Sequence, residues 1–148
     1  LDRCDRCDLL VGLEDFHLVA AARRECGLVL DIESCDRCAG CPGCGVITQG
    51  HGRVVVEVID APWAGVPVWI RWHKRRWICR ETTCQTVTFL EHSEKVCAPR
   101  ARLGVRAIRW AIRQLRFEGG PLSWGWPASW NHVEHRVVPY QAVPASRI

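Results

Sequence analysis

Apolar and polar positions alternate along much of the first ninety residues, and this alternation predicts a chain built mainly of β-strands. Leu28, Leu30 and Ile32 lie on one side of a period of two, so 28–33 is expected to be a strand. A glycine-containing turn at 23–27 would pair it with a strand over 16–22. Further strands are predicted over 46–49, 53–60, 66–79 and 86–90, with connections at 50–52 and 61–65.

A different period begins near residue 100 and predicts one helix over 100–118, stopped by Gly119-Gly120-Pro121. Its apolar residues recur at three- and four-residue steps and should pack against the rest of the fold: Val105, Ile108, Ile112 and Leu115. Arginines recur one position along at 102, 106, 109, 113 and 116, so a row of guanidinium groups should lie beside that stripe. Residues 119–148 are rich in Pro and Trp and keep neither period for long, which predicts an irregular tail.

Ten cysteines among 148 residues require a choice between disulfides and metal. Two pairs, Cys41-Pro42-Gly43-Cys44 and Cys79 with Cys84, flank strand-like sequence, which is the pattern of a zinc ribbon. The chain shows neither a leader-like start nor a run of about 20 apolar residues, so a reducing compartment and metal are favoured over disulfides. We therefore expect zinc on four thiolates, a closed set that leaves no position for water and is structural.

The remaining cysteines and histidines leave alternatives open. Cys4 and Cys7 are either free thiols near the terminus or, with Cys35 and Cys38, the ligands of a second metal site. Cys35 and Cys38 are also an alternative ligand pair for the first site. His51 and His92 are substitute ligands in one interpretation and surface or turn histidines in the favoured one.

The net charge of +4 says little, but its distribution indicates phosphate contacts. Arginine guanidinium and lysine ammonium groups neutralise the phosphates of the DNA backbone. Two clusters of arginine and lysine residues are candidates for this role. The alternative is a solvated charged face. The candidates are Arg71, Lys74, Arg75 and Arg76 at the end of one strand, and Arg102, Arg106, Arg109 and Arg113 on the helix.

A series of short motifs follows one another along the chain. They are Cys41-Pro42-Gly43-Cys44-Gly45, His51-Gly52-Arg53, Asp60-Ala61-Pro62-Trp63, Arg75-Arg76-Trp77-Ile78-Cys79, Cys84, Thr88-Phe89 and Ala98-Pro99-Arg100-Ala101-Arg102. In order and spacing they resemble the N-terminal region of the bacterial insertion-sequence transposases of the ISL-three type, and the resemblance covers roughly residues 9–117.

The resemblance implies a zinc site on Cys41, Cys44, Cys79 and Cys84, followed by a helix-turn-helix and a DDE-type catalytic domain. The helix at 100–118 matches the start of the helical region, and Ser129 to Val133 are a faint echo of a recognition helix. Because the chain stops at Ile148, the catalytic domain is expected to be absent, as in a truncated or frameshifted copy. The chain is therefore not expected to be an enzyme.

The sequence thus predicts a small α+β fold, a zinc ribbon of antiparallel hairpins followed by a basic helix. Its expected parts are an N-terminal hairpin segment (1–34), the ribbon (35–90), a connector with the helix (91–118) and the tail (119–148). The expected partner is double-stranded DNA, the terminal repeats of the element, in the bacterial cytoplasm and not on a membrane, with a homo-oligomer left open. The alternatives are a stand-alone ribbon that binds protein or RNA, and a thiol enzyme.

Overall fold

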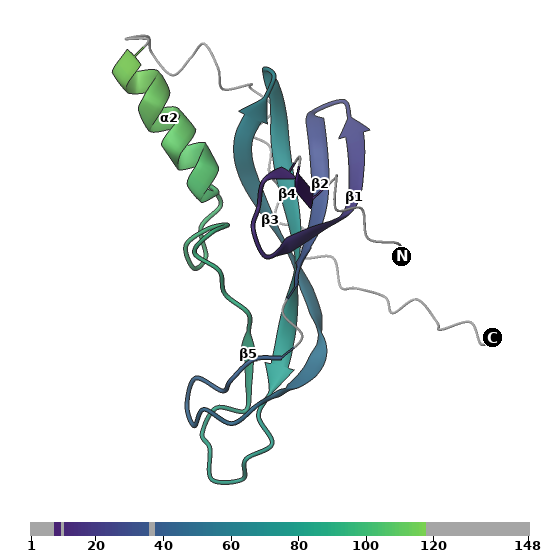
Figure 1. The fold of residues 1–148 in the computed structure, drawn as a ribbon, viewed down its shortest axis with the longest axis vertical. Helices are drawn as coiled ribbons and strands as arrows, with labels where there is room; N and C mark the ends of the chain where they lie inside the picture. Colours follow the sequence, from purple (N-terminus) through teal and green to yellow (C-terminus); the bar gives the residue numbers. More distant parts are fainter. Residues whose placement is uncertain (1–7, 10, 36–37, 118–148) are drawn as a thin grey trace, which may run out of the picture.

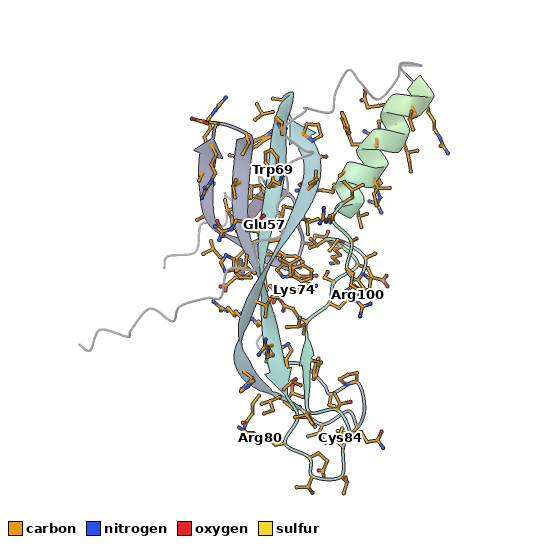
Figure 2. The ribbon with its side chains drawn as sticks, turned by 180° about the vertical axis from the view of Figure 1, so that it is seen from behind. Glu57, Trp69, Lys74, Arg80, Cys84 and Arg100 are labelled. Carbon is orange, nitrogen blue, oxygen red and sulfur yellow. The ribbon has the colours of Figure 1, made fainter. Side chains whose placement is uncertain are left out.

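A twisted five-stranded sheet organises the chain in the computed structural model, which describes residues 8–9, 11–35 and 38–117. β1 (Phe16–Arg24) pairs antiparallel with β2 (Gly27–Ser34), and β2 lies parallel to β4 (Val66–Ile78). β4 pairs antiparallel with β3 (Gln49–Trp63), and the short β5 (Thr88–Leu90) pairs with the far end of β4. The cysteine end and the single described long helix, α2 (Val105–Phe117), lie toward opposite ends of the elongated molecule (Figures 1 and 2).

The predicted connection at 50–52 was wrong, because β3 continues through it. The pairing of β3 with β4 shifts register between Gly50 and Arg53, and Gly52 takes a φ of 91° there. A bulge therefore accommodates the extra residues of β3, and the glycines do not end the strand. The second connection is also shorter than predicted: only Ala64 and Gly65 form it, both with positive φ, as a type I′ hairpin requires.

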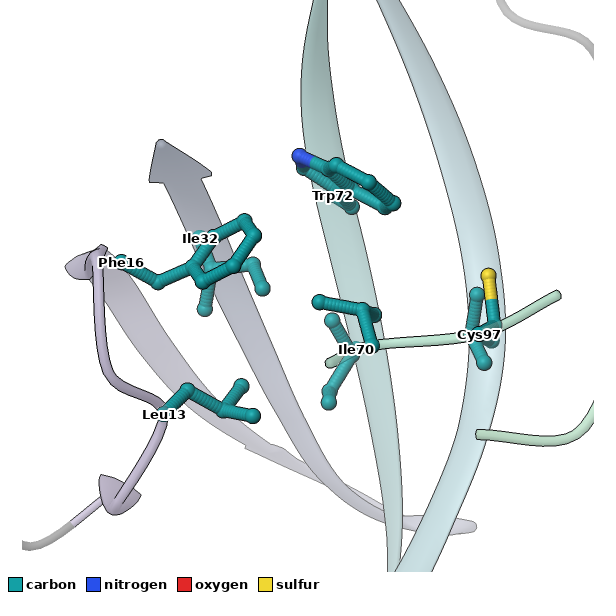
Figure 3. Close-up of a cluster of buried hydrophobic side chains, with 8 residues drawn as sticks. Leu13, Phe16, Ile32, Ile70, Trp72 and Cys97 are labelled. Carbon is teal, nitrogen blue, oxygen red and sulfur yellow. The ribbon is translucent and has the colours of Figure 1, made fainter. Parts of the chain in front are cut away.

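One face of the sheet holds the main core. Ile32, Val58, Ile70 and Trp72 are at most 1% exposed there, and Phe16 meets the Trp72 ring edge-on at 5.4 Å. Leu13, Val96 and Cys97 close this cluster from the segments before β1 and after β5 (Figure 3). The indole N–H of Trp72 donates to Glu91, which also accepts from the Ser34 hydroxyl, so the polar atom of this buried ring is satisfied.

The other face of the sheet holds a smaller buried cluster of Val29, Ile59 and Trp69 and, beside it, an ionic network. Asp31 of β2 accepts from His73 at 2.6 Å and pairs with Arg71 of β4 at 3.3 Å. Arg71 also reaches Glu57 of β3 at 3.7 Å. The parallel register that places Asp31 beside Arg71 joins segments forty residues apart, so this cross-strand network follows from topology and not from local sequence.

The helix α2 begins five residues later than predicted. Residues 98–104 are held in a turn and in a bridge between Leu103 and Ile59 instead. Ala107 is buried, and Arg106 donates to Asp60 of β3 and to the carbonyl of Val11. The helix therefore docks through its first turn.

The rest of the predicted apolar stripe does not pack within the part of the chain that the structure describes. Ile108, Ile112 and Leu115 are 43, 45 and 52% exposed. No helix-turn-helix is seen among residues 8–9, 11–35 and 38–117, and the predicted tail lies outside them.

Gly27, at the start of β2, tests how closely the sheet is packed at the β1–β2 turn. Its φ is 142°, and an added Cβ would lie 2.4 Å from the Pro67 carbonyl oxygen and 2.6 Å from the Trp69 ring. Gly27→Ala should lower the free energy of unfolding by roughly 2–3 kcal/mol. Urea unfolding followed by Trp fluorescence checks this. Gly50→Ala is the matched control, because open space surrounds Gly50, and an equal loss in both variants would contradict the packing argument.

Candidate metal centre

Two tight turns present the four predicted cysteine ligands. In the first, the Cys41 N–H donates to the Val46 carbonyl and Gly45 donates back to the Cys41 carbonyl at 2.8 Å, with Gly45 at a φ of 76°. In the second, Cys79 follows the last residue of β4, and its N–H donates to Val87 at 2.9 Å. Backbone hydrogen bonds thus shape each turn around its cysteines.

The four sulfur atoms form a compact cluster. All lie within 4.8 Å of one another, and the pairs Cys41–Cys84 and Cys44–Cys79 are each 3.6 Å apart. A tetrahedron of thiolates at the usual Zn–S distance has sulfurs about 3.8 Å apart, so the donor set fits zinc. Backbone N–H groups of Gly43 and Thr86 point at the sulfurs of Cys41 and Cys84 at 3.4 Å, and such donors orient and stabilise thiolate ligands.

The neighbouring cysteine thiols affect each other's ionisation. Burial raises the pKa of Cys41, but hydrogen bonds from the Gly43 and Cys44 backbone outweigh it and lower that pKa to about 6. A hydrogen bond from the Val46 backbone lowers the pKa of Cys44, but loss of hydration and the neighbouring thiols raise it to about 12. One thiolate therefore forms readily and discourages the next, and a divalent cation is what would hold all four ionised.

The other candidate ligands lie apart from this cluster. Cys35 and Cys38 do not join it, and Cys4 and Cys7 fall outside the described residues, so a second metal site stays a prediction. His51 and His92 are exposed and also stay apart from the sulfurs. Within the described residues, the cluster is made of Cys41, Cys44, Cys79 and Cys84.

Five of the eight predicted DNA-contacting cations have partners within the protein. Arg71 pairs with Asp31 and Glu57, and Arg106 pairs with Asp60, whose side chain is 4% exposed. Arg75 donates to the Ser34 carbonyl, and its buried Nε has no partner among the described residues. Lys74 stands over the Trp72 ring at 4.1 Å.

Four of the predicted cations are exposed: Arg76 on β4, Arg102 before α2, and Arg109 and Arg113 on α2. Of these, Arg102 also has an interaction within the protein. Asp60 and Asp31, which neutralise two of the eight cations, were missed by sequence reasoning. A lone acid inside the apolar run Val58-Ile59-Asp60 was the available signal for the first of them.

In the part of the chain that the structure describes, no helix is both long enough and apolar enough to cross a membrane.

Comparison with known families places a domain around the cysteine cluster. Residues 37–88, about a third of the chain, match the family described as the zinc-finger of transposase IS204/IS1001/IS1096/IS1165. This segment contains all four cysteines and the β3–β4 hairpin. No match to a catalytic domain was found, and no curated protein or solved structure matches the chain. Residues 37–88 are therefore a zinc-finger domain of the ISL3-family transposases, and zinc is the ion that their four cysteines indicate.

Proposed function

We propose that this chain is a DNA-binding fragment of a transposase, and that it binds the terminal repeats of an insertion sequence. The observation that supports the proposal is a set of exposed arginines that form no ion pair within the described residues. Arg109 and Arg113 lie one turn apart on the same face of α2, and Arg76 lies on β4. Such guanidinium groups are available for phosphate oxygens at little desolvation cost.

The zinc site has a structural role in this proposal. Four thiolates fill the coordination sphere and leave no position for water or a scissile phosphate. The ion would instead hold the two cysteine turns together at the end of β4, next to Arg76 and Arg80. We therefore assign DNA binding, and no strand cutting, to the residues around this site.

Arg71 and Arg106 are left out of the proposed interface, because their guanidinium groups neutralise carboxylates of the sheet. Releasing Arg106 to a phosphate would leave Asp60 buried without its counter-ion, which costs more than an exposed phosphate contact returns. The sequence-predicted set is thereby reduced to the cations that can reach DNA without breaking the fold.

Fluorescence anisotropy with the zinc-loaded chain tests the proposal. Wild-type protein should bind a labelled duplex carrying an element end more tightly than a scrambled duplex, with affinity that falls steeply as salt rises. Replacing both Arg109 and Arg113 by Gln should lower the slope of log K against log salt by about 2, because each phosphate contact contributes about 0.9.

The double variant Arg23→Gln/Arg24→Gln is the matched control. Both residues are exposed at the end of β1, the edge strand farthest in sheet order from β3, on which α2 packs. Equal effects from the two double variants would argue against an interface on α2. Preference for single-stranded RNA over duplex DNA would instead favour the alternative, a stand-alone ribbon that binds RNA.

A further inference from the structure

A tight turn precedes α2 and places an arginine in a conformation that favours glycine. Ala101 N–H donates to the Ala98 carbonyl at 3.1 Å and closes the turn, with Pro99 and Arg100 at its two central positions. Arg100 has a φ of 60°, and positive φ at this position after proline marks a type II turn. Gly or Asn normally fills it, because other side chains are disfavoured in the left-handed region.

The turn is held on both sides by the fold. Before it, Val96 and Cys97 are buried in the main core, each 2% exposed. After it, the Arg102 carbonyl accepts from Ile59 of β3 at 2.8 Å, and Val105 N–H donates back to Val96 at 2.9 Å. The backbone around Arg100 is therefore held in place on both sides, and the surrounding structure imposes the left-handed conformation of Arg100.

The side chain of Arg100 does nothing for this loop. It is exposed on the outer edge of the molecule, between the cysteine end and α2 (Figure 2), and forms no ion pair or hydrogen bond with any described residue. The acids before β1, Glu14 and Asp15, pair with Lys95 at 3.2 and 2.6 Å and not with Arg100. The conformation thus disfavours an arginine and the fold gains nothing from it, which indicates a role outside the fold.

We propose that Arg100 is a further DNA contact, presented to a backbone phosphate by this turn; the inference rests on the proposed DNA binding. A phosphate is favoured over a base edge because no described carboxylate orients the guanidinium plane, and base reading needs such orientation. Arg100 would extend the interface from the exposed arginines of α2 toward Arg76 and Arg80 at the cysteine end.

Arg100→Gly separates the side chain from the turn, because glycine tolerates the turn better than arginine does. In the zinc-loaded full chain, Tm should stay unchanged or rise by a few degrees. Affinity for duplex DNA should fall roughly 3- to 10-fold on every sequence, and the salt slope should fall by about 1. Arg100→Lys should retain most of the affinity and the slope, and Arg100→Asn, which also tolerates positive φ, should behave like Arg100→Gly.

The outcomes separate this inference from the proposed function. If the wild-type chain fails to bind duplex DNA, both are overturned. If the wild type binds and Arg100→Gly and Arg100→Asn bind equally well with the same slope, the Arg100 contact alone is overturned. A loss confined to one duplex sequence with an unchanged salt slope would also overturn it, since a base contact would then explain the data.

Discussion

Cys79→Ser is expected to abolish tight zinc binding and to unfold the cysteine end of the molecule. Cys79 links the end of β4 to the second turn, and its sulfur lies 3.6 Å from that of Cys44. Apparent zinc binding contributes about 10–16 kcal/mol in small structural sites, and a three-thiolate remnant loses much of it. We expect zinc affinity to fall by more than about 100-fold, measured by competition with a chromogenic chelator.

The structural consequence should be local. The pairing of β5 with β4 and the backbone bonds of Gly45 and Cys79 depend on the two turns staying together. Hydrogen exchange should therefore accelerate at these amides, while those of the Ile32, Ile70 and Trp72 cluster stay protected. Cys26→Ser is the control, because Cys26 is exposed in the turn between β1 and β2. Undiminished zinc affinity in Cys79→Ser would rule out a four-thiolate site that includes Cys79.

Arg106→Ala is expected to be the most destabilising single change at an arginine of α2. It would remove the counter-ion of Asp60, whose side chain is 4% exposed, and the donor to the Val11 carbonyl. Leaving such a carboxylate unpaired costs about 3 kcal/mol, at the lower end for buried pairs because Arg106 itself is 31% exposed. Urea unfolding of the zinc-loaded chain measures the loss.

Two further variants test the origin of that loss. Arg109 is exposed and lies three residues after Arg106 on α2. Arg109→Ala should therefore change stability by less than about 0.5 kcal/mol. Replacing Asp60 by Asn together with Arg106→Ala should recover part of the loss, because a neutral amide is cheaper to bury than a charge. Equal stability of Arg106→Ala and Arg109→Ala would show that the ion pair does not anchor the helix.

Local patterns predicted the elements whose signals are themselves local. The alternation around Leu30 predicts β2, and the closely spaced cysteines predict two metal-binding turns that the structure brings together. The glycines at 50 and 52 led to the wrong prediction of a connection within β3. A glycine indicates a local break, but the partner strand decides whether pairing continues. The period of α2 identified its apolar side without showing whether a partner covers Ile112.

The charged residues show the other limit of sequence reasoning. A cation is identified by its letter, but its availability depends on acids brought beside it by topology. Arg71 meets Asp31 through the parallel pairing of β2 and β4, and Arg106 meets Asp60 where α2 crosses β3. The left-handed turn at Arg100 gave only a weak signal, because proline predicts a turn without deciding the conformation of the next residue.

The four-sulfur zinc site holds the cysteine end together, and X-ray absorption at the zinc edge tests it directly. The measurement uses the purified full chain with Cys35 and Cys38 replaced by Ser, so that the alternative ligand pair is removed. The predicted result is one zinc per chain with four sulfurs at about 2.3 Å and no nitrogen or oxygen ligand. Loss of zinc from this variant, or a shell containing histidine or water, would contradict the assignment to Cys41, Cys44, Cys79 and Cys84.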